Sequence, residues 1–104
     1  MDAVSENDFA DQILEHGGRA IVAFWAEWCG PCRMVTPVLE ELEERHPDLT
    51  FATVNVEDDP DLARALQVTS IPTLLVFDRG KVQKRIVGAL PRGRLLEELA
   101  DWLT

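Results

Sequence analysis

Apolar and polar positions near the start of the chain predict a helix followed by a buried strand. The apolar residues between positions 9 and 14 recur at helical spacing. Ser5 and Asp8 precede them as a typical N-cap signal, and residues 16–18 (His-Gly-Gly) end the segment. Residues 20–26 are apolar throughout, which is typical of a strand buried on both faces of a sheet.

The next segments predict a second helix and a second strand. Apolar residues at helical spacing extend from about residue 31 to residue 46, and Pro37 inside this helix is expected to kink it. Residues 50–56 are rich in β-branched residues and predict a strand. Strand, helix and strand in close succession form a βαβ unit, so we expect the two strands to be parallel.

The remaining segments complete an α/β fold with a central mixed sheet flanked by helices on both faces. Leu62, Ala65 and Leu66 mark a short helix after Pro60. Strands at 73–77 and 82–87 flank Asp78-Arg79-Gly80, a turn signal for an antiparallel hairpin. A last helix over 92–103 is expected to bury its leucines, which are Leu95, Leu96, Leu99 and Leu103.

Length and charge narrow the class of protein. The 104 residues suit one domain, and a net charge of −9 argues against nucleic-acid binding, which needs concentrated cations. The longest apolar run has seven residues, against the roughly 18 or more of a membrane helix. The first twenty residues carry no basic-then-apolar leader. We expect a soluble cytoplasmic protein without membrane partners.

The charges are unevenly distributed along the sequence. Acidic side chains dominate residues 40–61, whereas residues 79–94 carry six bases and no acid. Two solvated faces explain this distribution, and so does a dipolar surface that orients partners during encounter. Both interpretations stay open at the level of sequence.

The two cysteines carry the candidate chemistry. Cys29-Gly30-Pro31-Cys32 lies where the buried strand turns into a helix. Residues three apart on a first helical turn have Cβ atoms about 5–6 Å apart, close to disulfide reach. The helix N-terminus favours a thiolate, Pro31 suits a first helical turn, and Gly30 leaves the backbone open to a substrate chain. This arrangement favours thiol–disulfide exchange.

Two other fates of the cysteines are less consistent with this context. A structural zinc site needs about four ligands. His16 and His46 are far apart in sequence, and each more simply supplies a cation near the end of its helix. Inert buried cysteines are common in general, but the Gly-Pro pair between them at a strand–helix junction argues against that fate.

Three separated segments resemble the thioredoxin family. Trp28-Cys29-Gly30-Pro31-Cys32, preceded by Phe24-Trp25-Ala26-Glu27, is similar to the family's active-site segment. Ile71-Pro72-Thr73 resembles its cis-proline loop, and Val87-Gly88-Ala89 resembles its substrate-groove loop. The resemblance covers nearly the whole chain and implies that residues 1–104 form a single thioredoxin domain.

The resemblance implies a role for each matched residue. Cys29 would be the exposed nucleophile that attacks a client disulfide, and Cys32, deeper in the fold, would resolve the mixed disulfide. Trp28 would shield the site, with Gly30 and Pro31 supporting it. A cis Pro72 would face the cysteines and orient the backbone of Ile71 toward the client. Gly88 and Ala89 would border the groove, while Trp25 and Trp102 are expected to be packing residues.

The family also implies partners. Client proteins with disulfides would be reduced, and a thioredoxin reductase would recharge the pair with electrons from NADPH, so we expect no bound cofactor or metal. A monomer is expected. The alternative is a thioredoxin-fold chaperone or assembly subunit whose redox activity is incidental. Replacing Cys29 by serine separates the two functions, since only the first requires the thiol.

Two positions depart from the family's pattern. Many thioredoxins carry a buried aspartate where this chain has Ala23, often paired with a lysine where it has Thr53. The family's account of proton transfer uses that carboxylate to deprotonate the second cysteine. Our hypothesis is that water or the leaving client thiolate takes the Cys32 proton instead. A higher stability is also expected, because an under-paired buried carboxylate is costly.

Overall fold

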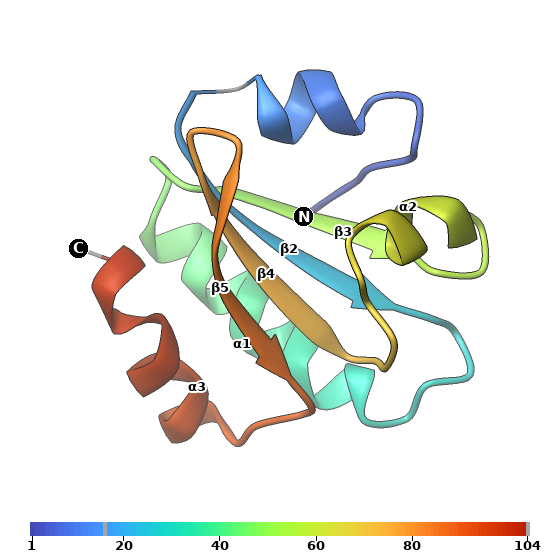
Figure 1. Cartoon of the computed structure of the whole chain (residues 1–104). Coiled ribbons are helices and arrows are strands. Elements are labelled where there is room, and N and C mark those ends of the chain that lie inside the picture. The colour runs from blue at the N-terminus through green and yellow to red at the C-terminus, as the bar shows by residue number, and fades with distance from the viewer. Residues whose placement is uncertain (16, 104) are drawn as a thin grey trace.

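The computed structural model describes residues 1–15 and 17–103 (Figure 1). Its elements are β1 (Asp2–Ala3), η1 (Ala10–Leu14), β2 (Arg19–Trp25), α1 (Cys32–Arg45), β3 (Thr50–Asn55), α2 (Pro60–Ala65), β4 (Thr73–Asp78), β5 (Lys81–Val87), α3 (Arg92–Leu99) and η2 (Ala100–Trp102). Every predicted helix and strand is present. β1 was not predicted, because two residues carry no readable periodicity.

The strands form one mixed sheet in the order β1-β3-β2-β4-β5. β2 pairs with β3 in parallel and with β4 antiparallel, and β4 and β5 form an antiparallel hairpin. The predicted βαβ unit is thereby confirmed. β2 lies at the centre of the sheet, which explains why its interior residues are apolar without alternation.

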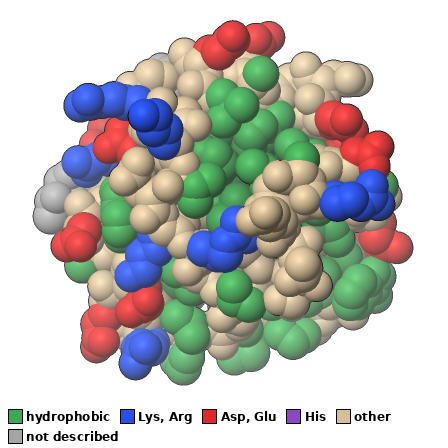
Figure 2. Space-filling view, in the orientation of Figure 1, with side chains coloured by type: hydrophobic (Ala, Val, Ile, Leu, Met, Phe, Trp, Pro, Cys, Tyr) green, Lys and Arg blue, Asp and Glu red, His purple; other side chains and the backbone are tan. Residues whose placement is uncertain are grey.

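Helices cover both faces of this sheet, as the sequence predicted. On one face, Ile21 and Ala23 of β2 pack with residues of α1 and α3. On the other face, Val22 and Phe24 pack with residues of η1 and α2. Figure 2 shows hydrophobic side chains gathered between η1 and the β4–β5 hairpin. We call the face with Ile21 and Ala23 the α1/α3 face and the face with Val22 and Phe24 the η1/α2 face.

The hairpin between β4 and β5 follows the predicted turn. Asp78 pairs with Lys81, so Arg79 and Gly80 form a two-residue loop, with φ angles of 55° and 79°. Positive φ at both loop positions is typical of a type I′ turn. A Cβ atom on Gly80 would lie 2.6 Å from the carbonyl oxygen of Leu14, so the close approach of η1 also requires glycine here.

The first helix differs in detail from the prediction. Ser5 does not cap the first helix: its backbone N–H donates to the Asp8 carboxylate (2.7 Å) in the turn that precedes η1, a π-helix. The predicted end of that helix at residues 16–18 includes His16, which lies outside the described residues.

The last helix buries fewer leucines than expected. Leu95 and Leu99 are buried, whereas Leu96 and Leu103 are only partly buried against the same core. The chain tightens into the 3₁₀ helix η2 after Leu99, so the α-helical stripe does not continue to Leu103. Across residues 1–15 and 17–103, no helix is both long enough and apolar enough to cross a membrane.

Candidate redox site

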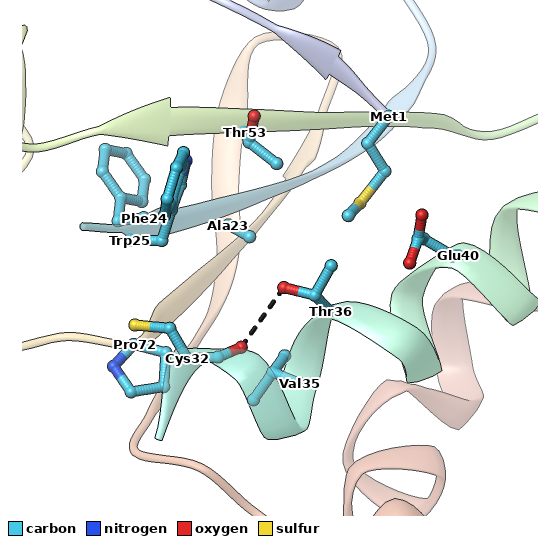
Figure 3. A pocket seen from close by; sticks show the side chains of 10 residues that line it. All are labelled: Met1, Ala23, Phe24, Trp25, Cys32, Val35, Thr36, Glu40, Thr53 and Pro72. Carbon is cyan, nitrogen blue, oxygen red and sulfur yellow. Dashed lines mark hydrogen bonds between the residues drawn. The ribbon is translucent and has the colours of Figure 1, made fainter. Parts of the chain in front are cut away.

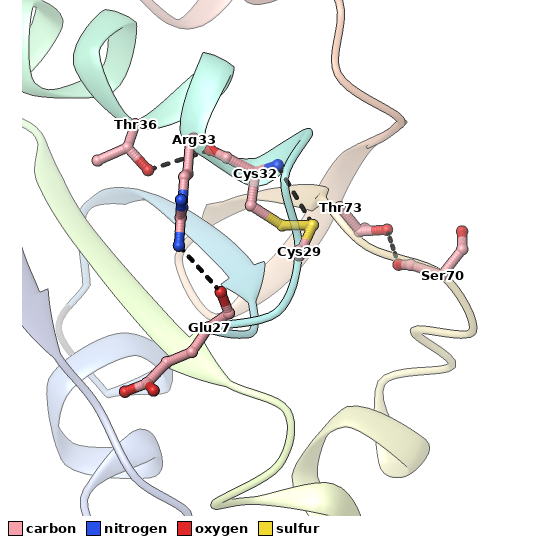
Figure 4. Close-up of a disulfide and its surroundings, with 7 residues drawn as sticks. All are labelled: Glu27, Cys29, Cys32, Arg33, Thr36, Ser70 and Thr73. Carbon is pink, nitrogen blue, oxygen red and sulfur yellow. Dashed lines mark hydrogen bonds between the residues drawn. A yellow bond between two sulfur atoms is a disulfide. The ribbon is translucent and has the colours of Figure 1, made fainter.

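A disulfide joins Cys29 and Cys32 at the junction of β2 and α1 (Figure 4). Cys29 lies in the turn after β2, and Cys32 is the first residue of α1. Their Cα atoms are 5.4 Å apart, within the usual disulfide range of roughly 4.4–6.8 Å. The pairing expected from the three-residue spacing is therefore confirmed.

The N-terminus of α1 points at the sulfur of Cys29. The backbone N–H of Cys32 donates to Cys29 Sγ at 3.2 Å. Gly30 and Pro31 supply the carbonyl oxygens that accept from the N–H groups of Arg33 and Met34, which completes the first turn. A thiolate at Cys29 would thus receive a direct hydrogen bond in addition to the partial charge of the helix end.

The burial of Cys29 corrects the expectation that it is the exposed member of the pair. In the disulfide form both cysteines are 4% exposed. They cluster with Ala26, and the partly buried Val56 and Ile71 pack against them. These two residues follow β3 and precede β4, so the fold covers Cys29 with loops remote in sequence. Trp28, by contrast, is 68% exposed.

The loop before β4 has the geometry that the resemblance implies. The Ile71–Pro72 peptide is cis. Pro72 and Cys32 line the same cavity, and Figure 3 shows their side chains next to each other. The N–H of Gly88 donates to the carbonyl oxygen of Pro72 (2.9 Å) and joins this loop to the end of β5.

A second hollow lies between Trp28 and the cis-proline loop. It measures about 400 Å³ and is lined by Trp28, Val56, Val68, Thr69, Ser70 and Ile71. Gly88 and Ala89 do not line it, and Ala89 instead packs against the core of the α1/α3 face. Gly88 has a φ of +99° with no heavy atom within 4 Å of an added Cβ, so the backbone is open at that point.

Comparison with known proteins assigns the family. The thioredoxin family model matches residues 1–101. The chain is 50% identical over 99 residues to "Thioredoxin" of Mycobacterium tuberculosis (strain ATCC 25618 / H37Rv), covering 94% of this chain and 85% of that protein. "Thioredoxin" of Alicyclobacillus acidocaldarius subsp. acidocaldarius is 43% identical over 93 residues, 88% of this chain and 89% of that protein. The chain belongs to the thioredoxin family.

A third relative has a different domain content. "Bifunctional thioredoxin reductase/thioredoxin" of Mycobacterium leprae (strain TN) is 46% identical over 99 residues, which are 94% of this chain and 22% of that protein.

Family membership, together with a cysteine pair at disulfide distance, makes this chain a protein-disulfide oxidoreductase with the disulfide reductase function of thioredoxins. The function and the fold predicted from the sequence are confirmed.

The departure from the thioredoxin pattern leaves a cavity behind Cys32 (Figure 3). Ala23 and Thr53 are register partners on β2 and β3. They line a cavity of about 250 Å³ together with Met1, Phe24, Trp25, Cys32, Val35, Thr36, Glu40 and Pro72. The sequence pointed to Ala23 and Thr53 but missed Thr36 and Glu40. The missed signal is their spacing, since they follow Cys32 at four and eight residues along α1.

Trp25, Trp102 and His46 lie in structural positions. Trp25 packs beside the cysteine cluster, and Trp102 packs against the α1/α3 core with Lys84 Nζ 5.7 Å from its ring centroid. Both are packing residues, as predicted. His46 is the C-cap of α1. Within the described part of the chain, no three His, Cys, Asp or Glu side chains are placed to hold a metal ion together.

One surface ion pair connects α1 to the start of α3. The Arg92 guanidinium donates a hydrogen bond to the Glu41 carboxylate. This bond lowers the pKa of Glu41 below its ordinary value of 4.5; burial opposes it, and the positive charges of Arg92 and Arg45 add to the lowering. The same contact raises the pKa of Arg92. The pair ties together the two helices of the face that contains the cavity.

Proposed function

We propose that Cys29 is the attacking cysteine and Cys32 the resolving cysteine of this disulfide reductase. The observation that carries the assignment is the hydrogen bond from the Cys32 N–H to Cys29 Sγ. In the dithiol form this donor stabilises negative charge on Cys29, and the thiolate is the form that attacks a disulfide. A donor aimed at one sulfur makes the two cysteines chemically unequal although they are equally buried.

The reaction proceeds in two exchanges. The Cys29 thiolate attacks one sulfur of a client disulfide, which forms a mixed disulfide and releases the other client sulfur as a thiolate. Cys32 then loses its proton and attacks Cys29 Sγ, and the second client sulfur leaves. Two electrons pass from the dithiol to the client, which ends with two thiols while Cys29 and Cys32 become a disulfide.

We propose that the client lies across Trp28, Ile71, Pro72 and Gly88, with Gly30 and Pro31 supporting the cysteines and Ala89 bordering the groove. Exposed Trp28 offers an apolar platform, and the hollow between it and Ile71 gives room for a client side chain. An extended client segment would pair with the backbone of Ile71 in the manner of an added strand.

The electron donor we propose is a thioredoxin reductase that draws on NADPH, with no cofactor bound to this chain. The fusion of the two functions in the name of the Mycobacterium leprae relative supports this partner. We further propose that residues 1–104 act as one domain, as a monomer in the cytoplasm, with disulfide-containing proteins as clients and neither nucleic acid nor membrane as a partner.

Cysteine variants test the two roles. Reduced protein is mixed with insulin, a small protein with accessible disulfides, and thiol release is measured with and without a regenerating reductase. We expect Cys29→Ser to abolish reduction and Cys32→Ser to accumulate a mixed disulfide visible by intact mass spectrometry. A mixed disulfide on Cys32 in the Cys29→Ser protein would reverse the assignment. Reduction by both variants at the parental rate would refute it.

The reduction potential of the Cys29–Cys32 pair tests the direction of electron flow. Equilibration against glutathione of defined redox ratio should give a value close to the roughly −270 mV typical of thioredoxins. A value of about −200 mV or higher, in the range of disulfide isomerases and oxidases, would contradict a reductase role. The chaperone alternative would then gain support if Cys29→Ser retained the ability to bind clients.

A further inference from the structure

The cavity behind Cys32 and the hollow in front of the disulfide are separate features of the site. The front hollow is lined by both cysteines and by Trp25, Ala26, Glu27, Arg33, Thr36 and Pro37. The rear cavity is lined by Cys32 but not by Cys29, Trp28 or Ile71. The client sulfur bonded to Cys29 therefore borders the front hollow, whereas the rear cavity is reached from Cys32.

The resolving step requires that Cys32 lose a proton while the client occupies Cys29. Cys32 is 4% exposed, and burial among apolar groups disfavours a thiolate. Among the strand residues that line the rear cavity with Cys32, Ala23 offers a methyl group and Thr53 a neutral hydroxyl. An acceptor for the proton must therefore be reached through one of the two spaces that Cys32 lines, the rear cavity or the front hollow.

The rear cavity has room for water and a carboxylate at its edge. A volume of about 250 Å³ accommodates several waters, each of which occupies about 30 Å³ in the liquid. Of the ten described residues that line it, Glu40 is the one with a carboxylate side chain. Glu40 is also exposed, so a proton that it accepts passes on to bulk solvent.

Helix α1 aligns the groups that such a transfer needs. Cys32, Thr36 and Glu40 are four residues apart and therefore lie on one side of the helix. The Thr36 hydroxyl donates to the carbonyl oxygen of Cys32 at 3.2 Å, which leaves its oxygen lone pairs as acceptors for water. Figure 3 shows Thr36 between Cys32 and Glu40 along the helix.

The other charged groups near the pair are less well placed. Glu27 and Arg33 line the front hollow, where the Arg33 guanidinium donates to the Glu27 carbonyl oxygen at 3.4 Å. Neither side chain lines the rear cavity. The ammonium group of Met1, whose side chain lines the rear cavity, is paired with Glu43 at 3.0 Å.

We propose that Glu40 accepts the proton of Cys32 through water in the rear cavity during resolution of the mixed disulfide, with Thr36 orienting that water. The proposal rests on Cys32 being the resolving cysteine. The proton leaves Cys32 Sγ for the water chain, and the chain delivers a proton to the Glu40 carboxylate. The Cys32 thiolate then forms a bond to Cys29 Sγ, the bond from Cys29 Sγ to the client sulfur breaks, and the client leaves as a thiolate.

The test compares Glu40→Gln with Glu44→Gln, which makes the same change of charge one helical turn further along α1 and outside the cavity. Reduced protein reacts with excess insulin, samples are quenched in acid, and intact mass spectrometry follows the mixed disulfide. We expect its decay at pH 7 to be about tenfold slower in Glu40→Gln, less than the 10²–10⁴-fold typical of direct general bases, because water remains as an acceptor. Glu44→Gln should match the parent.

Three further measurements separate proton transfer from a structural effect. The difference should shrink as pH rises toward 9, where hydroxide replaces the carboxylate, and Glu40→Asp should retain part of the rate. Added acetate at constant ionic strength should restore decay in Glu40→Gln. Formation of the mixed disulfide by Cys29 should be unchanged in all variants.

Several results would overturn the proposal. Equal decay in Glu40→Gln and Glu44→Gln would remove Glu40 from the reaction. Slow decay in Glu27→Gln instead would move the proton path to the front hollow. Slow decay in Glu40→Gln that responds to neither pH nor acetate would make the role of Glu40 purely structural. A failure of Cys32→Ser to trap a mixed disulfide on Cys29 would instead refute the assigned roles of the two cysteines, which distinguishes the two claims.

Discussion

The two faces of the sheet use the same strands but fill their centres differently. On the η1/α2 face, the rings of Phe24 and Phe77 are almost completely buried, and Phe77 packs edge-on against Phe9 with ring centroids 5.7 Å apart. On the α1/α3 face, Ala23 lies beside a cavity of about 250 Å³ that reaches Cys32. Tightly packed aromatic rings on the η1/α2 face stabilise the fold, whereas the α1/α3 face has unfilled space next to the reactive sulfur of Cys32.

This difference indicates that the packing that stabilises the fold and the redox chemistry depend on opposite faces of the same sheet. Neighbouring residues of β2 point to opposite faces, so a change at Ala23 reaches the redox pair while a change at Val22 reaches the other core. A substitution on the η1/α2 face should therefore change the free energy of unfolding and spare the redox chemistry. Substitutions at the cavity should change both.

Phe77→Ala should have the largest effect on stability. It removes a fully buried aromatic ring and its contact with Phe9, which costs about 3–5 kcal/mol. Urea denaturation of the oxidised protein measures the loss. The reduction potential of Cys29–Cys32 should stay the same, because Phe77 faces away from the cavity.

A milder substitution keeps this prediction testable if the alanine variant unfolds. Phe77→Leu retains part of the buried volume and should lose less stability than Phe77→Ala, again with an unchanged potential. A shift of the potential by about 30 mV, equivalent to about 1.4 kcal/mol, in a folded Phe77 variant would show that the two faces are coupled.

Ala23→Asp should have the next largest effect, and its sign depends on pH. Burial raises the pKa of the new carboxyl above the roughly 3.9 of the unfolded chain. Above that pH the unfolded state loses its proton first, so stability falls as pH rises from 4 to the folded pKa. We expect a loss of about 1–3 kcal/mol at pH 7, since one unit corresponds to about 1.4 kcal/mol.

The matched control is Ala23→Asn, which adds the same volume without a titrating group. Its stability difference from the parent should not change between pH 4 and pH 7. Ala23→Asp should also speed resolution of the mixed disulfide in stopped-flow experiments, because it places a base beside Cys32. An unchanged resolution rate would show that a carboxylate at this position has no role in this chain.

Two alanine-to-valine substitutions in β2 compare how much unfilled space each face of the sheet has. Ala23→Val adds methyl groups beside the cavity and should stabilise by roughly 0.5–1 kcal/mol. Ala20→Val adds them on the η1/α2 face, where Ala20 is 0% exposed, and should destabilise by about 1–3 kcal/mol through overpacking. Thermal or urea denaturation measures both. The same sign at both positions would refute the contrast between the faces.

Much of the fold and the redox pair itself could be predicted from the sequence, because they depend on local signals. The apolar run at 20–26 predicted the central strand, Asp78-Arg79-Gly80 predicted the hairpin, and the Cys-Gly-Pro-Cys segment predicted the redox pair. Each signal lies within a few consecutive residues. The resemblance to thioredoxins added the cis peptide before Pro72, which local rules alone do not predict.

What the sequence could not predict depends on segments that meet only in the fold. Cys29 is buried because Val56 and Ile71 from two distant loops pack against the cysteine cluster. The cavity is lined by Ala23 and Thr53, which become neighbours only through the pairing of β2 with β3, and by Glu40, which α1 brings to the same place. β1 forms by pairing with β3, although Asp2 and Ala3 show no strand pattern of their own.

The smallest effect is expected at the ion pair that joins α1 and α3 across the cavity-bearing face. The pKa of Glu41 is lowered by its hydrogen bond from Arg92. A carboxyl with a lowered folded pKa contributes stability above its unfolded pKa, near 4.5, and that stability is lost as pH falls through the folded value. Glu41→Gln should therefore be slightly less stable than the parent at pH 7, and the difference should shrink as pH falls below 4.5 and vanish once the pH is below the lowered pKa of folded Glu41.

Urea denaturation at pH 7 and at pH 3 measures this difference, with Glu44→Gln as the control for removing one negative charge from the same helix. Because the pair is on the surface, added salt should also reduce it. If Glu41→Gln is less stable than the parent by the same amount at both pH values, its effect comes from packing and not from the ion pair. The two helices of the cavity-bearing face would then be held together by their buried leucines, as Leu95 and Leu99 already suggest for α3.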